Sequence, residues 1–215
     1  MKRKYYLLGF ALVAAVLAAT AIAYPHLPPI VPTHWNAAGT ADAYAPKWRL
    51  FVAIPAMMLA FLGLFAVLPW LSPKRFEVDA FRSTYLYIMI VLLCMMVYFH
   101  ALVLWAALGR SVDMTRAIIG GVCLLFALLG NVLGKVRRNF YIGIRTPWTI
   151  ANETVWNATH RLGGKLFFLC GLVGFVLALL RAPFWLVGGI LAAGAAVPVI
   201  YSLVLYKKLE RHGEV

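Results

Sequence analysis

Apolar residues fall in six long runs along the 215-residue chain, and short segments rich in lysine, arginine, proline and glycine separate them. A run of about 20 apolar residues can cross the hydrocarbon of a bilayer as a helix. Backbone amides find no water there, and the alternating ten-residue segments of a barrel are absent, so each span should be helical. The pattern predicts an all-α, polytopic membrane helix bundle with about six transmembrane helices. The runs cover Tyr5 to Ala23, Leu50 to Leu71, Tyr85 to Leu108, Ala117 to Leu133, Lys165 to Leu180 and Phe184 to Tyr206.

Composition excludes a soluble globule and leaves no room for a separate soluble domain. Hydrophobic residues make up 64% of the chain and charged residues 13%. A net charge of +13 could suggest nucleic acid binding, but the basic residues sit in short clusters between apolar runs, where anionic lipid headgroups would meet them. The three cysteines each lie within a different run, which indicates buried thiols instead of disulfides or a zinc site.

The distribution of basic residues predicts the orientation. If the N-terminus is inside, 15 of the 20 Lys and Arg residues lie on the cytoplasmic side and five outside. An even number of spans then returns the C-terminus to the cytoplasm. The first run has a second interpretation, because residues 1–23 also imitate a cleavable signal peptide. Its length favours a retained span, and cleavage would leave five spans with the N-terminus outside.

The first outer segment, residues 24–47, has the character of an ordered lid. Asn36 and Asp42 favour turns through their side chains, and Gly39 permits a positive φ. His34 and Asp42, with His26, could bind a metal, but no tight two-histidine spacing supports a site. We therefore predict no metal and no cofactor.

The inner segment, residues 131–165, carries the richest polar sequence. Thr146 before Pro147 is typical of a helix start, so we expect a short helix in the inner headgroup layer before the fifth span begins. Glu153 and His160 are the one candidate acid and base pair, but no nucleophile, metal set or phosphate-binding glycine loop accompanies them. We predict that the protein is not an enzyme. The basic residues of this segment form a rim for lipid headgroups or a protein partner: Arg137, Arg138, Arg145, Arg161 and Lys165.

These two segments resemble the SdpI family of bacterial toxin-immunity membrane proteins, and the resemblance covers essentially the whole chain. The outer motif is Pro29, Pro32, His34, Asn36, Gly39 and Asp42. The inner motif is Asn131, Gly134, Lys135, Asn139, Gly143, Ile144, Arg145, Thr146, Pro147, Trp148 and Thr149, followed by Asn152, Val155, Trp156, Thr159, His160 and Arg161. We divide the chain into an N-terminal helical hairpin with the outer loop, residues 1–71, and an SdpI-like four-helix region with the inner signature loop 131–165, residues 72–215.

The resemblance implies an immunity protein of the bacterial cytoplasmic membrane that protects the cell from a secreted, membrane-active peptide toxin. The founding role of the family also includes a second function, so the resemblance implies a protein that senses the toxin and holds a transcriptional repressor at the membrane. The expected partners are the peptide at the outer face, a cytosolic repressor and anionic lipids, without direct nucleic acid binding. The candidate binding residues are His34, Asn36, Gly39, Asp42, Asn139, Arg145, Thr146, Trp148, Asn152, Trp156, His160 and Arg161.

Three other function classes remain open: a small transporter, a membrane enzyme and a signalling scaffold without an immunity role. A small transporter would use Pro55 and Pro198 to break helices, with His100 as an ionisable group within the membrane. A membrane enzyme would use Glu153 and His160. Against a transporter, no acidic residue lies within a predicted span, where coupling-ion and proton sites usually place one.

Overall fold

The computed structural model describes residues 2–214. Within them, six helices are long and apolar enough to cross a membrane, which confirms the predicted polytopic helical bundle. They are α1 (Lys2–Ala23), α2 (Ala53–Leu71), α3 (Arg82–Ala107), α4 (Met114–Leu133), α6 (Glu153–Leu179) and α7 (Phe184–Arg211). A five-residue helix, α5 (Pro147–Ala151), precedes α6. Short 3-10 turns follow α1, flank α2 and precede α3, at Tyr24–His26, Lys47–Phe51, Lys74–Phe76 and Val78–Phe81. Large apolar side chains are exposed on the helices, as lipid-facing surfaces require.

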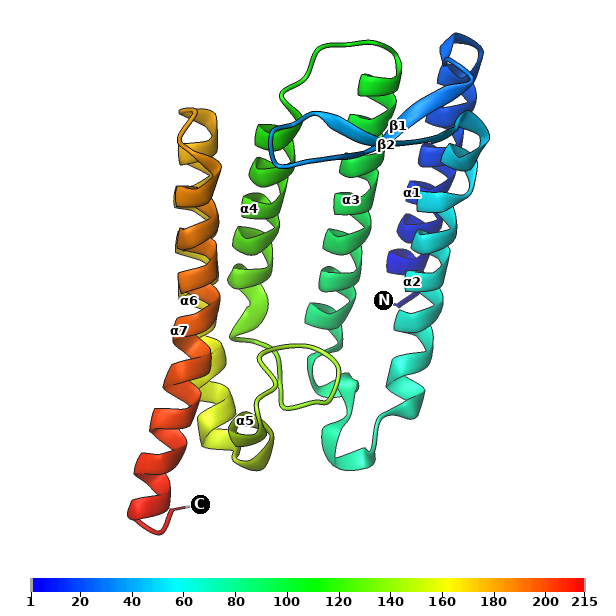
Figure 1. Ribbon diagram of the computed structural model, residues 1–215. Helices are drawn as coiled ribbons and strands as arrows, with labels where there is room; N and C mark the ends of the chain where they lie inside the picture. Colours follow the sequence, from blue (N-terminus) through cyan, green and yellow to red (C-terminus); the bar gives the residue numbers. More distant parts are fainter. Residues whose placement is uncertain (1, 215) are drawn as a thin grey trace.

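The spans form two groups of three helices that meet where α3 packs against α4. Helices α1, α2 and α3 pack on one another, and α4, α6 and α7 form the second group (Figure 1). The largest apolar core lies among the first group and extends to the inner loop, with Met58, Tyr85 and Met89 at its centre. A buried contact between Thr20 Oγ1 and His100 Nε2, 2.7 Å long, joins α1 to α3. His100 is therefore a hydrogen-bonded packing residue, as a lone histidine on an apolar face usually is.

Helices α4 and α6 approach so closely that their backbones touch. A Cβ added at Gly171 would lie 2.5 Å from the carbonyl oxygen of Cys123 and from the amide nitrogen of Ala127. A Cβ at Gly130 would collide with the backbone of α6 at Phe168. Without a hydrophobic drive between helices in lipid, small residues at such a seam permit the close packing that holds two spans together.

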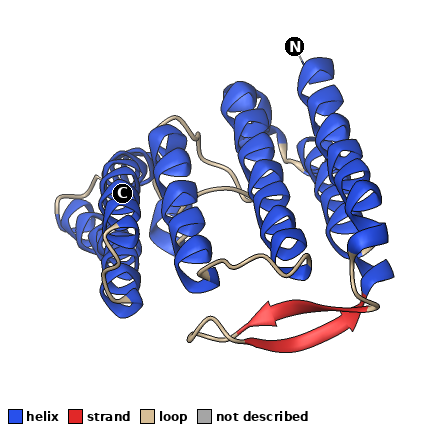
Figure 2. Cartoon of the chain, turned by 90° about the horizontal axis from the view of Figure 1, so that it is seen from above, coloured by secondary structure: helices blue, strands red, loops and turns tan. Residues whose placement is uncertain are grey.

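The first outer segment folds into a β-hairpin, which the sequence analysis did not predict. Strand β1 (Ile30–Trp35) pairs antiparallel with β2 (Ala41–Pro46), and the register shifts twice, on either side of His34. Figure 2 shows the hairpin reaching from the end of α1 past α3 towards α4. The hairpin covers one end of the bundle, and the inner loop lies at the opposite end (Figure 1).

The fifth span begins earlier than the apolar run suggested. We expected it at Lys165, after a separate interfacial helix, but α6 is continuous from Glu153 to Leu179. The separate helix is the single turn α5, which ends at Ala151. Neither Pro55 nor Pro198 breaks its span, because Pro55 lies in the first turn of α2 and α7 continues through Pro198.

Candidate functional site

Asn36 and Gly39 build the tip of the outer hairpin. The Asn36 side-chain oxygen accepts hydrogen bonds from the amides of Ala38 and Thr40, at 3.0 and 3.1 Å. Gly39 has a φ of +77°, and the amide of Gly39 donates to the Asn36 carbonyl over 2.9 Å. A side chain at Gly39 would be strained and would also meet Thr115 Oγ1 at 2.9 Å. These two predicted residues therefore set the shape of the tip.

His34 and Asp42 face each other across the hairpin. His34 Nδ1 lies 2.5 Å from Asp42 Oδ1, and 68% and 42% of the two side chains are exposed. A polar contact this exposed contributes little to stability, at most about 1 kcal/mol. Both side chains are thus exposed at the end of the bundle that the hairpin covers, where a ligand can reach them.

Two contacts fix the hairpin over the bundle. The ammonium group of Lys47 donates to the carbonyl oxygens of Tyr24 and Leu27, each over 3.0 Å, and lies 4.3 Å from the centre of the Tyr24 ring. At the tip, Thr115 Oγ1 donates to the Ala37 carbonyl over 3.2 Å. The base of the hairpin is therefore tied to the end of α1, and its tip to the start of α4.

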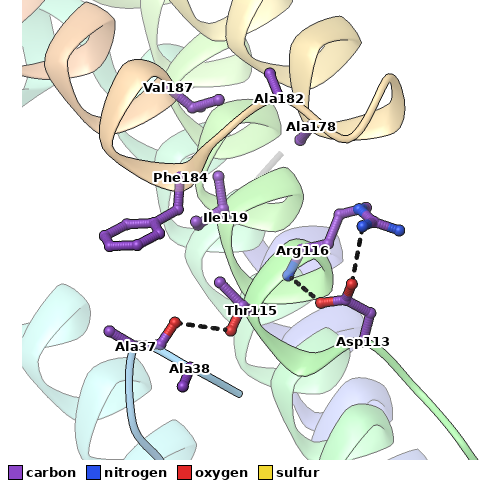
Figure 3. Close-up of a pocket in the computed structure, with 10 residues that line it drawn as sticks. All are labelled: Ala37, Ala38, Asp113, Thr115, Arg116, Ile119, Ala178, Ala182, Phe184 and Val187. Atoms are coloured by element: carbon purple, nitrogen blue, oxygen red, sulfur yellow. Dashed lines mark hydrogen bonds and ion pairs between the residues drawn. The ribbon is translucent and has the colours of Figure 1, made fainter.

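A cavity of about 240 Å³ lies under the hairpin tip, where α4 begins and α6 turns into α7 (Figure 3). Its polar wall is an ion pair: Asp113 Oδ2 is 2.9 Å from the Arg116 guanidinium, while Asp113 Oδ1 caps α4 by accepting from the Arg116 amide over 3.0 Å. The remaining wall is mostly apolar. The lining residues are Ala37, Ala38, Asp113, Thr115, Arg116, Ile119, Ala178, Ala182, Phe184 and Val187.

Asn139 closes the inner loop between α4 and α5. Its side chain is fully buried, and its amide nitrogen donates to the carbonyl oxygens of Arg137 and Ile142, at 2.8 and 3.0 Å. Its oxygen accepts from the amides of Tyr141 and Ile142, at 2.7 and 2.8 Å. All the hydrogen-bonding capacity of this amide is used within the loop.

The predicted helix start at Thr146 is confirmed. The Thr146 hydroxyl accepts from the Thr149 amide over 3.2 Å, and the Thr149 hydroxyl accepts from the Thr146 amide over 2.9 Å, as in a reciprocal capping box. Thr146 also contacts Ser202 of α7, with 3.2 Å between the two hydroxyl oxygens. Asn152 caps the next helix, α6, through the amide of Val155. Both residues therefore have a structural role: Thr146 caps the start of α5, and Asn152 caps the start of α6.

Trp156 and His160 of α6 bind the inner loop through hydrogen bonds. Their rings stack with centroids 4.0 Å apart, and both side chains are fully buried. Trp156 Nε1 donates to the Val136 carbonyl over 2.8 Å. His160 Nδ1 lies 2.8 Å from the Trp156 carbonyl, and His160 Nε2 accepts from the Ile144 amide over 3.0 Å. Since a carbonyl can only accept and an amide can only donate, the ring carries its proton on Nδ1.

The predicted residues of the inner loop fall into a buried group and an exposed group. Asn139, Trp156 and His160 are buried and bond to the loop itself, whereas Arg145 and Arg161 are exposed. Trp148 is half-buried in α5. His160 uses both ring nitrogens in structural bonds, and in residues 2–214 it forms no contact with Glu153, which is exposed at the start of α6. Glu153 and His160 therefore do not form the acid and base pair that the sequence offered.

Basic side chains surround the buried part of the inner loop. Arg138 donates to the carbonyl oxygens of Ile150 and Ala151, each over 3.3 Å, where the dipole of α5 favours a cation. Its guanidinium also lies 5.3 Å from the centre of the Phe76 ring. Arg145 bonds to the Phe140 carbonyl. Lys74, Arg137 and Arg138 line a shallow cavity together with Glu77 and Glu153.

Sequence reasoning missed every residue that lines the cavity under the hairpin tip, here called the outer cavity; the predicted Asn36 and Gly39 only flank the lining residues Ala37 and Ala38. Asp113 and Arg116 stand three residues apart at the start of a span, a spacing typical of a capped helix start, and Phe184 opens the last span. The first of these signals could have indicated the helix start. Nothing in the sequence indicated that the residues share a cavity with the hairpin tip, because they come from three distant segments.

The six apolar helices, together with the matches that follow, define a multi-pass helical protein of the bacterial cytoplasmic membrane. Residues 135–202 match the model of the SdpI/YfhL protein family, and residues 11–59 match a domain of unknown function, DUF1648. The chain is 28% identical over 190 residues to "Immunity protein SdpI" of Bacillus subtilis, which covers 87% of this chain and 89% of the relative. These findings confirm the resemblance to the SdpI family. No solved structure matches the chain significantly.

Proposed function

We propose that this protein is an immunity protein that protects a bacterial cell from a secreted, membrane-active peptide. The observation that carries the proposal is the similarity to "Immunity protein SdpI" along most of both chains, which includes the outer hairpin as well as the inner loop. The relative is named as an immunity protein and not as an enzyme, in agreement with the scattered acid and base residues. The bundle acts by binding the peptide, without chemical turnover.

The outer cavity is the proposed binding site for the peptide. A membrane-active peptide carries apolar side chains beside polar groups, and the cavity offers an apolar wall beside the pair of Asp113 and Arg116. Its volume of about 240 Å³ is below the roughly 300–1,000 Å³ of sites that enclose a whole small molecule. It therefore accommodates one or two side chains, while His34 and Asp42 on the exposed hairpin contact more of the peptide.

A sensing role would use the opposite face. Helix α4 begins at the outer cavity and ends at the inner loop, where exposed Lys135, Arg137 and Arg145 offer a basic surface to an acidic patch of a cytosolic repressor. For the peptide to control this surface, it must bind one state of the bundle better than another, and a differential of 1.4 kcal/mol shifts the equilibrium tenfold. Immunity and sensing are separable, since peptide binding alone suffices for the first.

The proposal is tested by survival of a toxin-sensitive bacterium that expresses the protein. The wild-type chain should raise the peptide concentration needed for killing, whereas Arg116→Gln and Phe184→Ala should lower protection severalfold. Arg110→Gln is the matched control, because Arg110 is exposed at the same end of the bundle but does not line the cavity. Absence of protection by the wild-type protein would refute the proposed function. Equal losses in Arg116→Gln and Arg110→Gln would refute the assigned site.

Asp42→Asn separates recognition from stability. Because the pair with His34 is exposed, the change should shift the free energy of unfolding by less than about 1 kcal/mol. A loss of protection at unchanged stability would support contact between the hairpin and the peptide. Unchanged protection would show that the hairpin side chains take no part in recognition.

The sensing role needs its own experiment. A cytosolic DNA-binding protein should co-purify with the wild-type chain only after exposure to the peptide, and Lys135→Gln with Arg137→Gln should release it. Recovery of the same protein with and without peptide would contradict a sensor.

A further inference from the structure

A third cavity, of about 460 Å³, lies between α6 and α7 at the end of the bundle that carries the inner loop. Arg161 and Lys165 stand four residues apart on α6, so both side chains project from one face of that helix. Tyr201 of α7 lies across from them. The lining residues are Thr154, Asn157, Ala158, Arg161, Leu162, Lys165 and Tyr201.

The charge in this cavity is unbalanced. Its lining contains two cations, three neutral hydrogen-bonding side chains and no carboxylate. The neighbouring basic cavity, which Lys74 and Arg137 line, includes Glu77 and Glu153 as counter-charges. Within residues 2–214 neither Arg161 nor Lys165 forms an ion pair. Two exposed cations without an internal partner are suited to an anion from outside the protein.

The depth of the cavity indicates which anion it meets. Gly134 is the C-terminal cap of the span α4, and a Cβ added there would lie 3.7 Å from the Cα of Arg161. Arg161 is therefore level with the end of a transmembrane helix, at the boundary between hydrocarbon and headgroups. One turn deeper into the membrane than Lys165 and Tyr201, Leu169 of α6 and Val197 of α7 are exposed apolar side chains. The cavity thus combines a basic rim at phosphate depth with apolar surface where an acyl chain would lie.

We propose that this cavity binds the phosphate group of an anionic phospholipid. The planar guanidinium of Arg161 can donate two parallel hydrogen bonds to phosphate oxygens, and Lys165 adds a second positive charge from the same helix face. Asn157 and the Tyr201 hydroxyl add neutral hydrogen bonds, and the acyl chains lie along Leu169 and Val197. A bound lipid would contact α6 and α7 together, at the point where both continue beyond the end of α4. This inference depends on the membrane spans and not on the immunity function.

The test uses the full-length protein, purified in a mild detergent and studied by native mass spectrometry. Added dioleoyl phosphatidylglycerol should be retained on the wild-type protein at concentrations where dioleoyl phosphatidylcholine is lost. Arg161→Gln and Lys165→Gln should each weaken retention about fivefold, the effect expected for one basic side chain near an anionic surface. Tyr201→Phe should give a smaller loss with unchanged packing.

Lys208→Gln is the matched control, because Lys208 is an exposed cation on α7 that does not line the cavity. It should leave lipid retention unchanged. Equal retention of the two lipids by the wild-type protein, or equal losses in Lys208→Gln and Arg161→Gln, would overturn the proposal. A third arm adds inorganic phosphate at the lipid concentration. Displacement of the lipid by phosphate at that concentration would assign the cavity to a free anion and overturn the lipid assignment.

Discussion

Replacing Gly143 by alanine should destabilise the protein more than a glycine-to-alanine change usually does, because the added methyl group would collide with His160. Gly143 has a φ of +115°, a region that residues with a side chain rarely adopt. An added Cβ would also collide with His160 Nε2 and would lie 3.1 Å from His160 Cδ2. The ring cannot easily retreat, because it stacks on Trp156 and is bonded at both nitrogens.

The magnitude follows from these two separate penalties. Strained backbone at such a φ costs about 1–3 kcal/mol. Displacing the imidazole breaks the bond from the Ile144 amide and leaves a buried polar group without a partner, for about another 1–3 kcal/mol. Gly143→Ala should therefore lower the free energy of unfolding by about 2–6 kcal/mol. In a His160→Ala background only the backbone penalty remains, so the two changes should be coupled by about 1–3 kcal/mol.

Unfolding of the purified protein in mixed micelles, driven by sodium dodecyl sulfate and followed by tryptophan fluorescence, measures these differences. Gly109→Ala is the control, because Gly109 has a φ of +73° but no atom within 4 Å of an added Cβ. It should cost about 1–2 kcal/mol. Equal effects of Gly143→Ala and Gly109→Ala, or the same effect of Gly143→Ala with and without the imidazole, would refute the reasoning.

Two further predictions concern the end of α6 and the orientation of the bundle. Arg181→Gly should stabilise the protein by about 1 kcal/mol in the same assay, because Arg181 has a φ of +64° where the equivalent caps of α3 and α7 have glycine; a loss of stability would contradict this. In a variant without its three native cysteines, Thr40→Cys should react with an impermeant maleimide on intact cells and Arg145→Cys should not. The reverse labelling would invert the predicted orientation, with the N-terminus inside.

The sequence was sufficient for features that depend on local pattern. Six spans follow from apolar runs of membrane-crossing length, and the start of α5 follows from Thr146 and Pro147, since a cap and a proline act on their own helix turn. The start of α6 was wrong because residues Glu153 to Arg161 are mostly polar. Those residues remain helical because Trp156 and His160 pack against the inner loop, a contact that the apolar run does not report.

The hairpin and the outer cavity could not be predicted from local sequence pattern. The sequence indicated an ordered lid but no strands, and β1 tolerates Pro32 as part of a two-stranded sheet whose register shifts nearby. The cavity depends on contacts between the hairpin tip, the start of α4 and the turn before α7. Such contacts join residues far apart in the sequence, so only the folded chain shows them.

The backbone seam between α4 and α6 has a mechanical consequence. Because the backbones of α4 and α6 touch at Gly130 and Gly171, neither helix can shift or rotate against the other unless the two separate. The pair should therefore move as one rigid body. One end of this pair lines the cavity beneath the hairpin tip, and the other end packs against the inner loop through Trp156 and His160. A displacement of the first end should therefore be transmitted to the second, because the paired helices bend little.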